Sequence, residues 1–187
     1  MYRILTIEDR VRVPPDKLGS DVKEAIRLSL AESLEGKISK DINGVFLAIL
    51  DVFDIGEGII EPEDPGVFFD AKYKTMVFQP ELHELVKGEV VEITEFGVFI
   101  RIGPIDGLCH VSQVMDDFVS YDEKQNRLVG KESKRSLQVG DVVLARVIAV
   151  SLDKKEINKI NLTMRQPGLG NIKWFEEEIE KKKKEEK

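Results

Sequence analysis

The chain has 187 residues, a formal net charge of −7 and 42% apolar residues, which is enough to bury a hydrophobic core. This length fits one large domain or two small ones, and the acidic total argues against a protein that coats duplex DNA non-specifically. No apolar run approaches the ~18 residues of a membrane span, and charges interrupt the first ten residues, which therefore lack a signal-peptide core. We expect a soluble, cytoplasmic protein without a membrane partner.

The single cysteine, Cys109, excludes a disulfide within the chain, which fits a reducing compartment. A structural zinc site needs about four ligands, and Cys109 with His83 and His110 cannot complete one. The sequence therefore predicts neither a metal site nor a cofactor.

The amino-terminal residues begin with a strand and a helix. Imperfect alternation over Arg3–Val13 indicates the strand, which a Pro-Pro pair ends. Ser20 or Asp21 can cap a helix with an apolar stripe, and Gly36 would end it. The stripe residues lie at helical spacing: Val22, Ile26, Leu30 and Leu34.

Two further strands are predicted over residues 45–52 and 67–78. The segment between them, Asp54–Gly66, is rich in turn residues, so we expect an exposed loop there. Residues 1–80 thus predict a small α+β unit.

From Gly88 onward the pattern changes to short strands between turn signals, which is typical of a small closed barrel of the OB kind. The expected strands are 88–95, 97–102, 106–111, 118–121, 141–151 and 159–165. After Pro167 we expect a helix with Ile172, Phe175 and Ile179 on one side, followed by a solvated, charged tail. The expected domains are therefore 1–80, 81–168 and 169–187.

An aromatic pair is the most informative feature of the predicted barrel. Every second residue of 98–102 is apolar and should fill the barrel, so Phe99 and Arg101 should point outward. Gly97 indicates a bulge that would bring Phe96 onto the same outer surface. Two exposed rings beside an arginine form a stacking platform for unpaired bases, worth roughly 1–3 kcal/mol per base. Spacing alone leaves a core position for either ring equally open.

His110 lies between Cys109 and Val111, and it faces the same platform if those neighbours face the core. On spacing alone, an ordinary hydrogen-bonded surface histidine is the more common interpretation.

The stretch Phe96-Gly-Val-Phe99, followed by Gly107-Leu-Cys-His-Val-Ser112, resembles the signature of the S1-type RNA-binding domain. Gly140–Asp153 and Ile160–Met164 resemble the long fourth strand and the last strand of that family. The resemblance implies that one group of residues lines a site for single-stranded RNA: Phe96, Phe99, His110 and the basic Lys159, with Asp153 beside them.

Four further basic residues are candidates for additional phosphate contacts: Arg146, and Lys131, Lys134 and Arg135 between the histidine strand and Gly140. An extra segment, Asp116–Lys134, separates the histidine strand from Gly140 and leaves the path of the RNA open.

The amino-terminal half adds a second resemblance. Three stretches, Met1–Pro15, Gly56–Pro62 and Ala71–Phe78, are similar to the family of the archaeal E-prime subunit of RNA polymerase, the counterpart of the seventh subunit of eukaryotic RNA polymerase II. This resemblance implies a truncated ribonucleoprotein-like domain before the S1-type OB-fold barrel.

The same resemblance implies three partners: the smaller F subunit of RNA polymerase, the RNA polymerase core and single-stranded RNA. It also implies a non-catalytic stalk subunit that guides nascent transcript. The tip that docks on the polymerase would contain Gly56, Gly58, Pro62 and Pro65.

We also considered other classes of function. Cys109 and His110 should point to opposite faces of a strand, so no nucleophile–base pair is predicted there, and the carboxylates are scattered. The alternatives are an S1-type module of an RNA decay or translation complex, and an acidic scaffold whose barrel contacts only protein.

Overall fold

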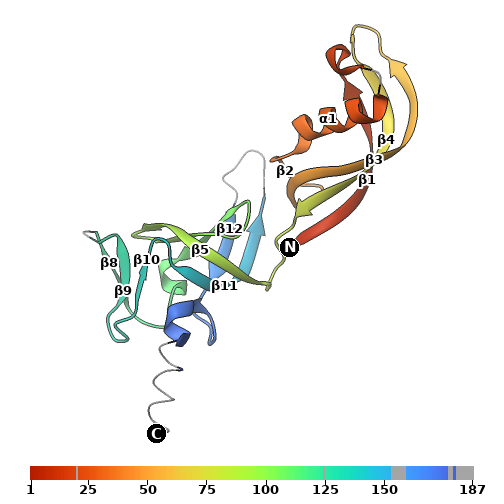
Figure 1. The fold of residues 1–187 in the computed structure, drawn as a ribbon. Coiled ribbons are helices and arrows are strands. Elements are labelled where there is room, and N and C mark those ends of the chain that lie inside the picture. Colours follow the sequence, from red (N-terminus) through yellow and green to blue (C-terminus); the bar gives the residue numbers. More distant parts are fainter. Residues whose placement is uncertain (20, 124, 153–158, 177–178, 180–187) are drawn as a thin grey trace. The chain divides into compact units, whose positions relative to one another are not determined.

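The computed structural model describes the chain except for residues 20, 124, 153–158, 177–178 and 180–187. The chain folds into two compact units, of which the first contains Met1–Gln79 and the second begins at Pro80 (Figure 1).

The first unit is a four-stranded antiparallel sheet, in the order β1-β4-β3-β2, with one helix that contacts β1 and β3. Its elements are β1 (Tyr2–Val13), the 3-10 turn η1 (Pro15–Lys17), α1 (Val22–Leu34), β2 (Ile38–Ser39), β3 (Gly44–Ile60) and β4 (Val67–Phe78). The α+β interpretation of this half is confirmed.

The helix α1 begins and ends where the sequence predicts. Asp21 is the capping residue, and its carboxylate accepts a hydrogen bond from the backbone N–H of Lys23 at 3.0 Å; the alternative cap, Ser20, lies outside the described residues. Ile26 and Leu30 are buried in the core between helix and sheet. The stripe does not extend to Val22, which is exposed at the first turn.

The expected loop over Asp54–Gly66 is wrong in its first half, because β3 continues to Ile60. Gly58 pairs with Phe69 of β4, and a Cβ at Gly58 would lie 2.8 Å from the Phe69 ring. The register between β3 and β4 shifts between Ile55 and Gly58. Glycines are common at such bulges, so the turn-like composition reflects a bulged strand and not a loop.

The second unit is built on a closed barrel of five strands. They are β5 (Leu85–Thr94), β6 (Gly97–Arg101), β7 (Asp106–His110), β11 (Val142–Ser151) and β12 (Lys159–Thr163). The short strand β12 pairs in parallel with β7 and antiparallel with β11, which closes the barrel. Val98 and Ile100 of β6 are buried inside it together with Val143, Ala145 and Val147 of β11. The expected OB-fold barrel is confirmed.

The extra segment folds as a separate three-stranded antiparallel sheet in the order β10-β9-β8. It follows the 3-10 turn η2 (Val111–Gln113), and its strands are β8 (Val119–Asp122), β9 (Arg127–Gly130) and β10 (Ser136–Gln138). The sequence predicted only the first of these strands. The other two, of four and three residues, were not predicted.

The carboxy-terminal segment packs on the barrel through a residue that the sequence interpretation missed. β13 (Gly170–Asn171) pairs with β11, and helical structure begins at Ile172. Among the described residues of this helix Trp174 is buried, whereas Ile172 and Phe175 of the predicted side are half-buried and Ile179 is 53% exposed. The sequence interpretation did not include Trp174 in the packed surface.

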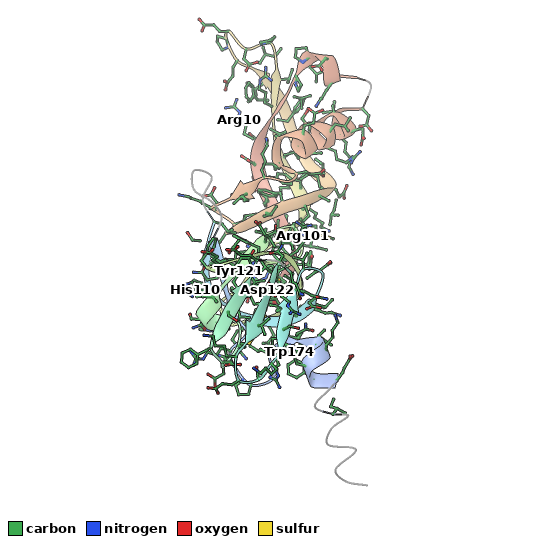
Figure 2. The ribbon with its side chains drawn as sticks, turned by 90° about the vertical axis from the view of Figure 1, so that its left-hand side faces the viewer. Arg10, Arg101, His110, Tyr121, Asp122 and Trp174 are labelled. Carbon is green, nitrogen blue, oxygen red and sulfur yellow. The ribbon has the colours of Figure 1, made fainter. Side chains whose placement is uncertain are left out.

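Three interactions hold Trp174, which is labelled in Figure 2, and the adjacent Lys173 in place. The indole Nε1–H donates to the backbone oxygen of Ser136 at 3.3 Å, and the Arg135 guanidinium lies 5.5 Å from the ring centroid. Lys173 Nζ contacts the buried carboxylate of Asp141 at 2.6 Å. The segment that begins at Gly170 is therefore part of the barrel's packing.

Replacing Trp174 by alanine is expected to destabilise the second unit by about 3–5 kcal/mol, because a large buried side chain is removed. Urea unfolding followed by circular dichroism measures the change. The control Ile179→Ala removes an exposed side chain and should change the unfolding free energy by less than about 0.5 kcal/mol. Equal stability of the two variants would show that Trp174 does not contribute to the packing of the barrel.

Candidate nucleic-acid interface

Phe96 and Phe99 are brought together by the tight hairpin between β5 and β6. The expected bulge at Gly97 is absent: Gly97 pairs with Thr94, and the chain turns at residues 95–96. A Cβ on Gly97 would lie 2.5 Å from the backbone oxygen of Cys109, so glycine allows β6 and β7 to approach closely. The outward position of Phe96 therefore comes from the turn.

The two rings form an edge-to-face pair on the outer surface. Their centroids are 6.1 Å apart and their planes lie at 89°. Phe96 is 52% exposed and Phe99 is half-buried, while the intervening Val98 is fully buried inside the barrel. Both rings thus face solvent, as the sequence interpretation required for a stacking platform.

His110 is exposed at the end of β7, where it pairs with Gly97 across the β6–β7 hairpin (Figure 2). The backbone N–H of Ser112 donates to His110 Nδ1 at 3.3 Å, and the Ser112 hydroxyl lies 2.9 Å from the same nitrogen. A backbone N–H can only donate, so Nδ1 acts as acceptor and the ring proton of the neutral form sits on Nε2. His110 thereby offers a donor to solvent beside the aromatic pair.

Two outward side chains near Phe99 were missed. Leu108 is directly opposite Phe99 on β7, and Asn161 is opposite Leu108 on β12. Leu108 is half-buried and Asn161 is exposed. Their outward direction follows from strand alternation, but only the parallel register of β7 and β12 brings Asn161 to this surface.

Arg101 shares the outer face with Phe99, but its guanidinium is already engaged. It makes two hydrogen bonds to the Asp106 carboxylate across the hairpin, at 3.0 and 3.3 Å. The hydrogen bond and the charge of Asp106 raise the pKa of Arg101. A carboxylate therefore competes with RNA phosphate for Arg101.

Arg146 lies on β11, which β12 separates from the histidine strand. Its Nη1 donates to the backbone oxygen of His83 at 3.2 Å. Lys159 begins β12, but its side chain lies outside the described residues, as does all of Asp153. Of the predicted site residues, the structure brings together Phe96, Phe99 and His110. Arg146 lies on β11, which is not adjacent to the strands that carry Phe99 and His110.

The basic residues of the extra segment differ in their surroundings. Lys131 and Lys134 are exposed, whereas Arg135 is half-buried with its guanidinium over Trp174. Lys131 and Lys134 are thus better placed than Arg135 for phosphate contacts.

Cys109 and His110 lie on opposite faces of β7. The Cys109 thiol is buried, and desolvation raises its pKa to about 12, while His110 is exposed. Within the described part of the chain, no group of three or more His, Cys, Asp or Glu residues could hold a metal ion, and no helix is long and apolar enough to cross a membrane.

The candidate docking tip is the β3–β4 hairpin of the first unit. The four predicted residues, Gly56, Gly58, Pro62 and Pro65, are all exposed. Sequence reasoning missed Ile59 and Ile60, which end β3 with 49% and 71% exposure. The sequence signal that could have identified them is a pair of adjacent isoleucines within a stretch rich in Gly and Pro, where exposure is expected.

Two acidic residues of this tip are paired with arginines of β1. Arg12 makes two hydrogen bonds to Asp64, at 2.7 and 2.8 Å, and Arg10 contacts Glu61 at 2.9 Å. The hydrogen bonds from Arg12 and from the Gly66 N–H lower the pKa of Asp64 from 3.8 to about 2. These contacts fix the tip on the edge strand.

The comparisons with known proteins agree with both units. A model of the S1 RNA binding domain matches residues 79–159. A model of the SHS2 domain found in the N terminus of Rpb7p/Rpc25p/MJ0397 matches residues 8–65. The fold and site thus define a protein with an SHS2 domain followed by an S1-type RNA-binding barrel.

Full-length relatives define it further. DNA-directed RNA polymerase subunit Rpo7 of Sulfolobus acidocaldarius is 36% identical over 184 residues, covering 98% of this chain and 100% of the relative. The Rpo7 subunit of Saccharolobus solfataricus is 38% identical over 176 residues, with 94% and 97% covered. The chain belongs to the Rpo7 family of DNA-directed RNA polymerase subunits, which confirms the resemblance inferred from the sequence.

The S1 barrel is also shared more widely. Ribonuclease R of Vibrio cholerae is 37% identical over 87 residues, which is 46% of this chain but only 11% of the relative.

The Arg12–Asp64 pair makes a prediction about pH. Because the folded pKa of Asp64 is depressed, its contribution to stability is present above pH ~4 and is lost as the pH falls towards ~2. In Arg12→Ala we expect the pKa of Asp64 to rise towards 3.8, measured by NMR titration of its carboxyl carbon. Arg10→Ala is the matched control and should leave that pKa unchanged; the same low value in all three proteins would contradict the assignment to Arg12.

Proposed function

We propose that this member of the polymerase family is a non-catalytic stalk subunit that binds single-stranded nascent RNA on the outer face of its barrel. The observation that carries the proposal is the Phe96–Phe99 pair, whose centroids lie 6.1 Å apart on the solvent side of a strand with a filled core face. Exposed rings offer flat apolar surfaces on which unpaired bases stack with little regard to sequence.

Polar groups around the rings suit the rest of a nucleotide. His110 offers its Nε2–H, and the Asn161 amide supplies both a donor and an acceptor. Lys159, Lys131 and Lys134 are the candidate phosphate contacts. Because Arg101 is held by Asp106, stacking contributes more to affinity here than a dense cationic field.

The chemistry of the barrel supports binding over catalysis. Its cysteine is buried with its pKa raised to about 12, and the neighbouring histidine faces the other way. A nucleophile needs a base within hydrogen-bond reach, and Cys109 and His110 do not meet that requirement.

The protein docks on RNA polymerase core through the β3–β4 hairpin and pairs with the F subunit. The exposed Ile59 and Ile60 supply apolar contact area next to the Gly and Pro residues of the tip. The full-length similarity to Rpo7 favours this role over a module of RNA decay, because the match to Ribonuclease R is limited to the barrel. As part of a polymerase it acts beside the DNA template, in the cytoplasm.

Removing one ring tests RNA binding. Phe99→Ala is expected to weaken binding of single-stranded RNA by about 1–3 kcal/mol, roughly five- to 150-fold in Kd. Fluorescence anisotropy with a labelled oligonucleotide measures it, and thermal unfolding checks that the variant is folded. Val139→Ala, at another exposed apolar side chain, is the control; equal affinity of wild type and Phe99→Ala would refute the stacking platform.

The docking proposal is tested by copurification. Ile60→Glu should abolish recovery of polymerase core with the tagged chain while the F subunit is still recovered, because the charge must be desolvated in the interface with the core. The control Leu28→Glu alters an exposed leucine on α1 and should retain both. Recovery of core with Ile60→Glu at the wild-type level would exclude the hairpin tip as the docking site.

A further inference from the structure

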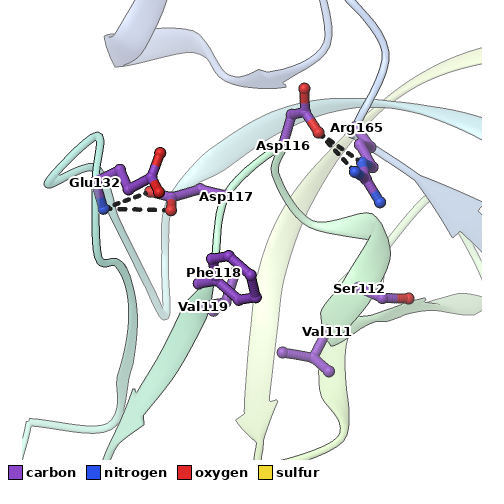
Figure 3. A pocket seen from close by; sticks show the side chains of 8 residues that line it. All are labelled: Val111, Ser112, Asp116, Asp117, Phe118, Val119, Glu132 and Arg165. Carbon is purple, nitrogen blue, oxygen red and sulfur yellow. Dashed lines mark hydrogen bonds and ion pairs between the residues drawn. The ribbon is translucent and has the colours of Figure 1, made fainter.

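A pocket of about 400 Å³ lies where the barrel meets the extra three-stranded sheet. Val111 and Ser112 of η2 form one wall, and Phe118, Glu132 and Arg165 belong to the others (Figure 3). No part of the RNA face described above includes Phe118, Glu132 or Arg165.

The pocket is continuous with the aromatic pair through backbone contacts. The Val111 N–H donates to the backbone oxygen of Phe96 at 2.9 Å. Ser112 contacts His110 Nδ1 through both its N–H and its hydroxyl. The pocket therefore adjoins the surface that carries Phe96 and His110.

Two flat groups of the pocket suit a nucleobase. Phe118 is 74% exposed, and its backbone oxygen accepts from the Lys131 N–H at 2.9 Å, which fixes its place in the small sheet. Arg165 is held by two hydrogen bonds to Asp116, at 2.7 and 2.9 Å. Aromatic rings and guanidinium planes are the side chains on which splayed bases stack.

Carboxylates outnumber cations in the pocket: Asp116, Asp117 and Glu132 line it together with one guanidinium, that of Arg165, which is paired with Asp116. Asp117 accepts from the backbone N–H groups of Ser133 and Glu132, which lowers its pKa and keeps it ionised. Glu132 adds an exposed carboxylate beside it (Figure 3). Carboxylates repel phosphate but accept hydrogen bonds from exocyclic amines, such as N4 of cytosine. Uracil carries a carbonyl oxygen at that position, which a carboxylate repels, and its donor on the same edge is the single N3–H in the ring.

We propose that this pocket is a base-selective subsite, in which a nucleobase with an exocyclic amine stacks on Phe118 and donates to the carboxylates beside it. The inference rests on the proposed RNA binding by the barrel and adds a preference for amino-bearing bases over uracil. The bases on Phe96 and Phe99 are held without such a preference, because every base has a stacking face.

Decamers of cytidine and of uridine test the proposal, since the two pyrimidines differ in the exocyclic group that meets the carboxylates. Binding of each labelled decamer to the full chain is measured by fluorescence anisotropy at one salt concentration. Wild type should bind the cytidine decamer about tenfold more tightly, the value of one good hydrogen-bonded contact to a base. Glu132→Gln should bring the ratio of the two affinities towards one.

Phe118→Ala should weaken binding of the cytidine decamer by about tenfold through loss of stacking. Phe99→Ala is the matched aromatic control and should weaken both decamers equally. Equal wild-type affinity for the two decamers, or wild-type behaviour of both Phe118→Ala and Glu132→Gln, would overturn the subsite and leave the proposed RNA binding intact. No binding of either decamer by wild type would overturn both.

A basic peptide is the other occupant that the carboxylates could attract. A labelled lysine–arginine decamer, titrated in the same assay, separates the two cases. Saturable peptide binding that Phe118→Ala abolishes, with unchanged RNA binding, would assign the pocket to a protein partner and refute the RNA subsite.

Discussion

Closure of the barrel by β12 is the constraint on which the nucleic-acid face depends. This five-residue strand must pair with β7 on one side and β11 on the other. The fit is tight: a Cβ on Gly107 would lie 2.7 Å from the Leu162 side chain. Once the inner positions are filled, strand alternation directs the intervening side chains to solvent, and they form one surface only because the strands are held in this register. The exposure of Phe99 thus follows from the filled core face of β6, and that of Phe96 follows from the turn before it.

The electrostatics explain how an acidic chain of net charge −7 can still carry an RNA face. Several arginines are held in pairs with carboxylates: Arg12 with Asp64, Arg101 with Asp106, and Arg165 with Asp116. Such exposed pairs contribute little to stability, but they fix flat guanidinium groups in defined positions and reduce the long-range field. In the proposed RNA face, ring stacking and a few lysines therefore supply the contacts, and the carboxylates near η2 belong to the proposed base-selective subsite.

Much of the architecture could be predicted because it follows from local patterns. The α1 stripe, the run of short strands between turn signals, the alternation over residues 98–102 and the S1-like motifs indicated two folded units, a barrel and a possible outward position for Phe99. Errors arose where pairing partners distant in sequence decide the outcome. Gly58 looked like part of a loop but pairs with Phe69 just after a register shift in β3, and Trp174 was missed although its indole donates to Ser136, which lies 38 residues away in the chain.

The sequence by itself indicated the kind of surface: alternation within one strand allows Phe99 to point away from the core, and the resemblance to the S1 family implies RNA. Only the tertiary structure decided what stands beside Phe99. Phe96 reaches it through a two-residue turn, and Leu108 and Asn161 reach it through strand register. Phe118 of the small sheet lines a separate pocket together with η2. The physical reason is that the direction of a side chain is a local property of the backbone. Which side chains become neighbours on adjacent strands depends instead on hydrogen-bond pairing between segments far apart in the chain.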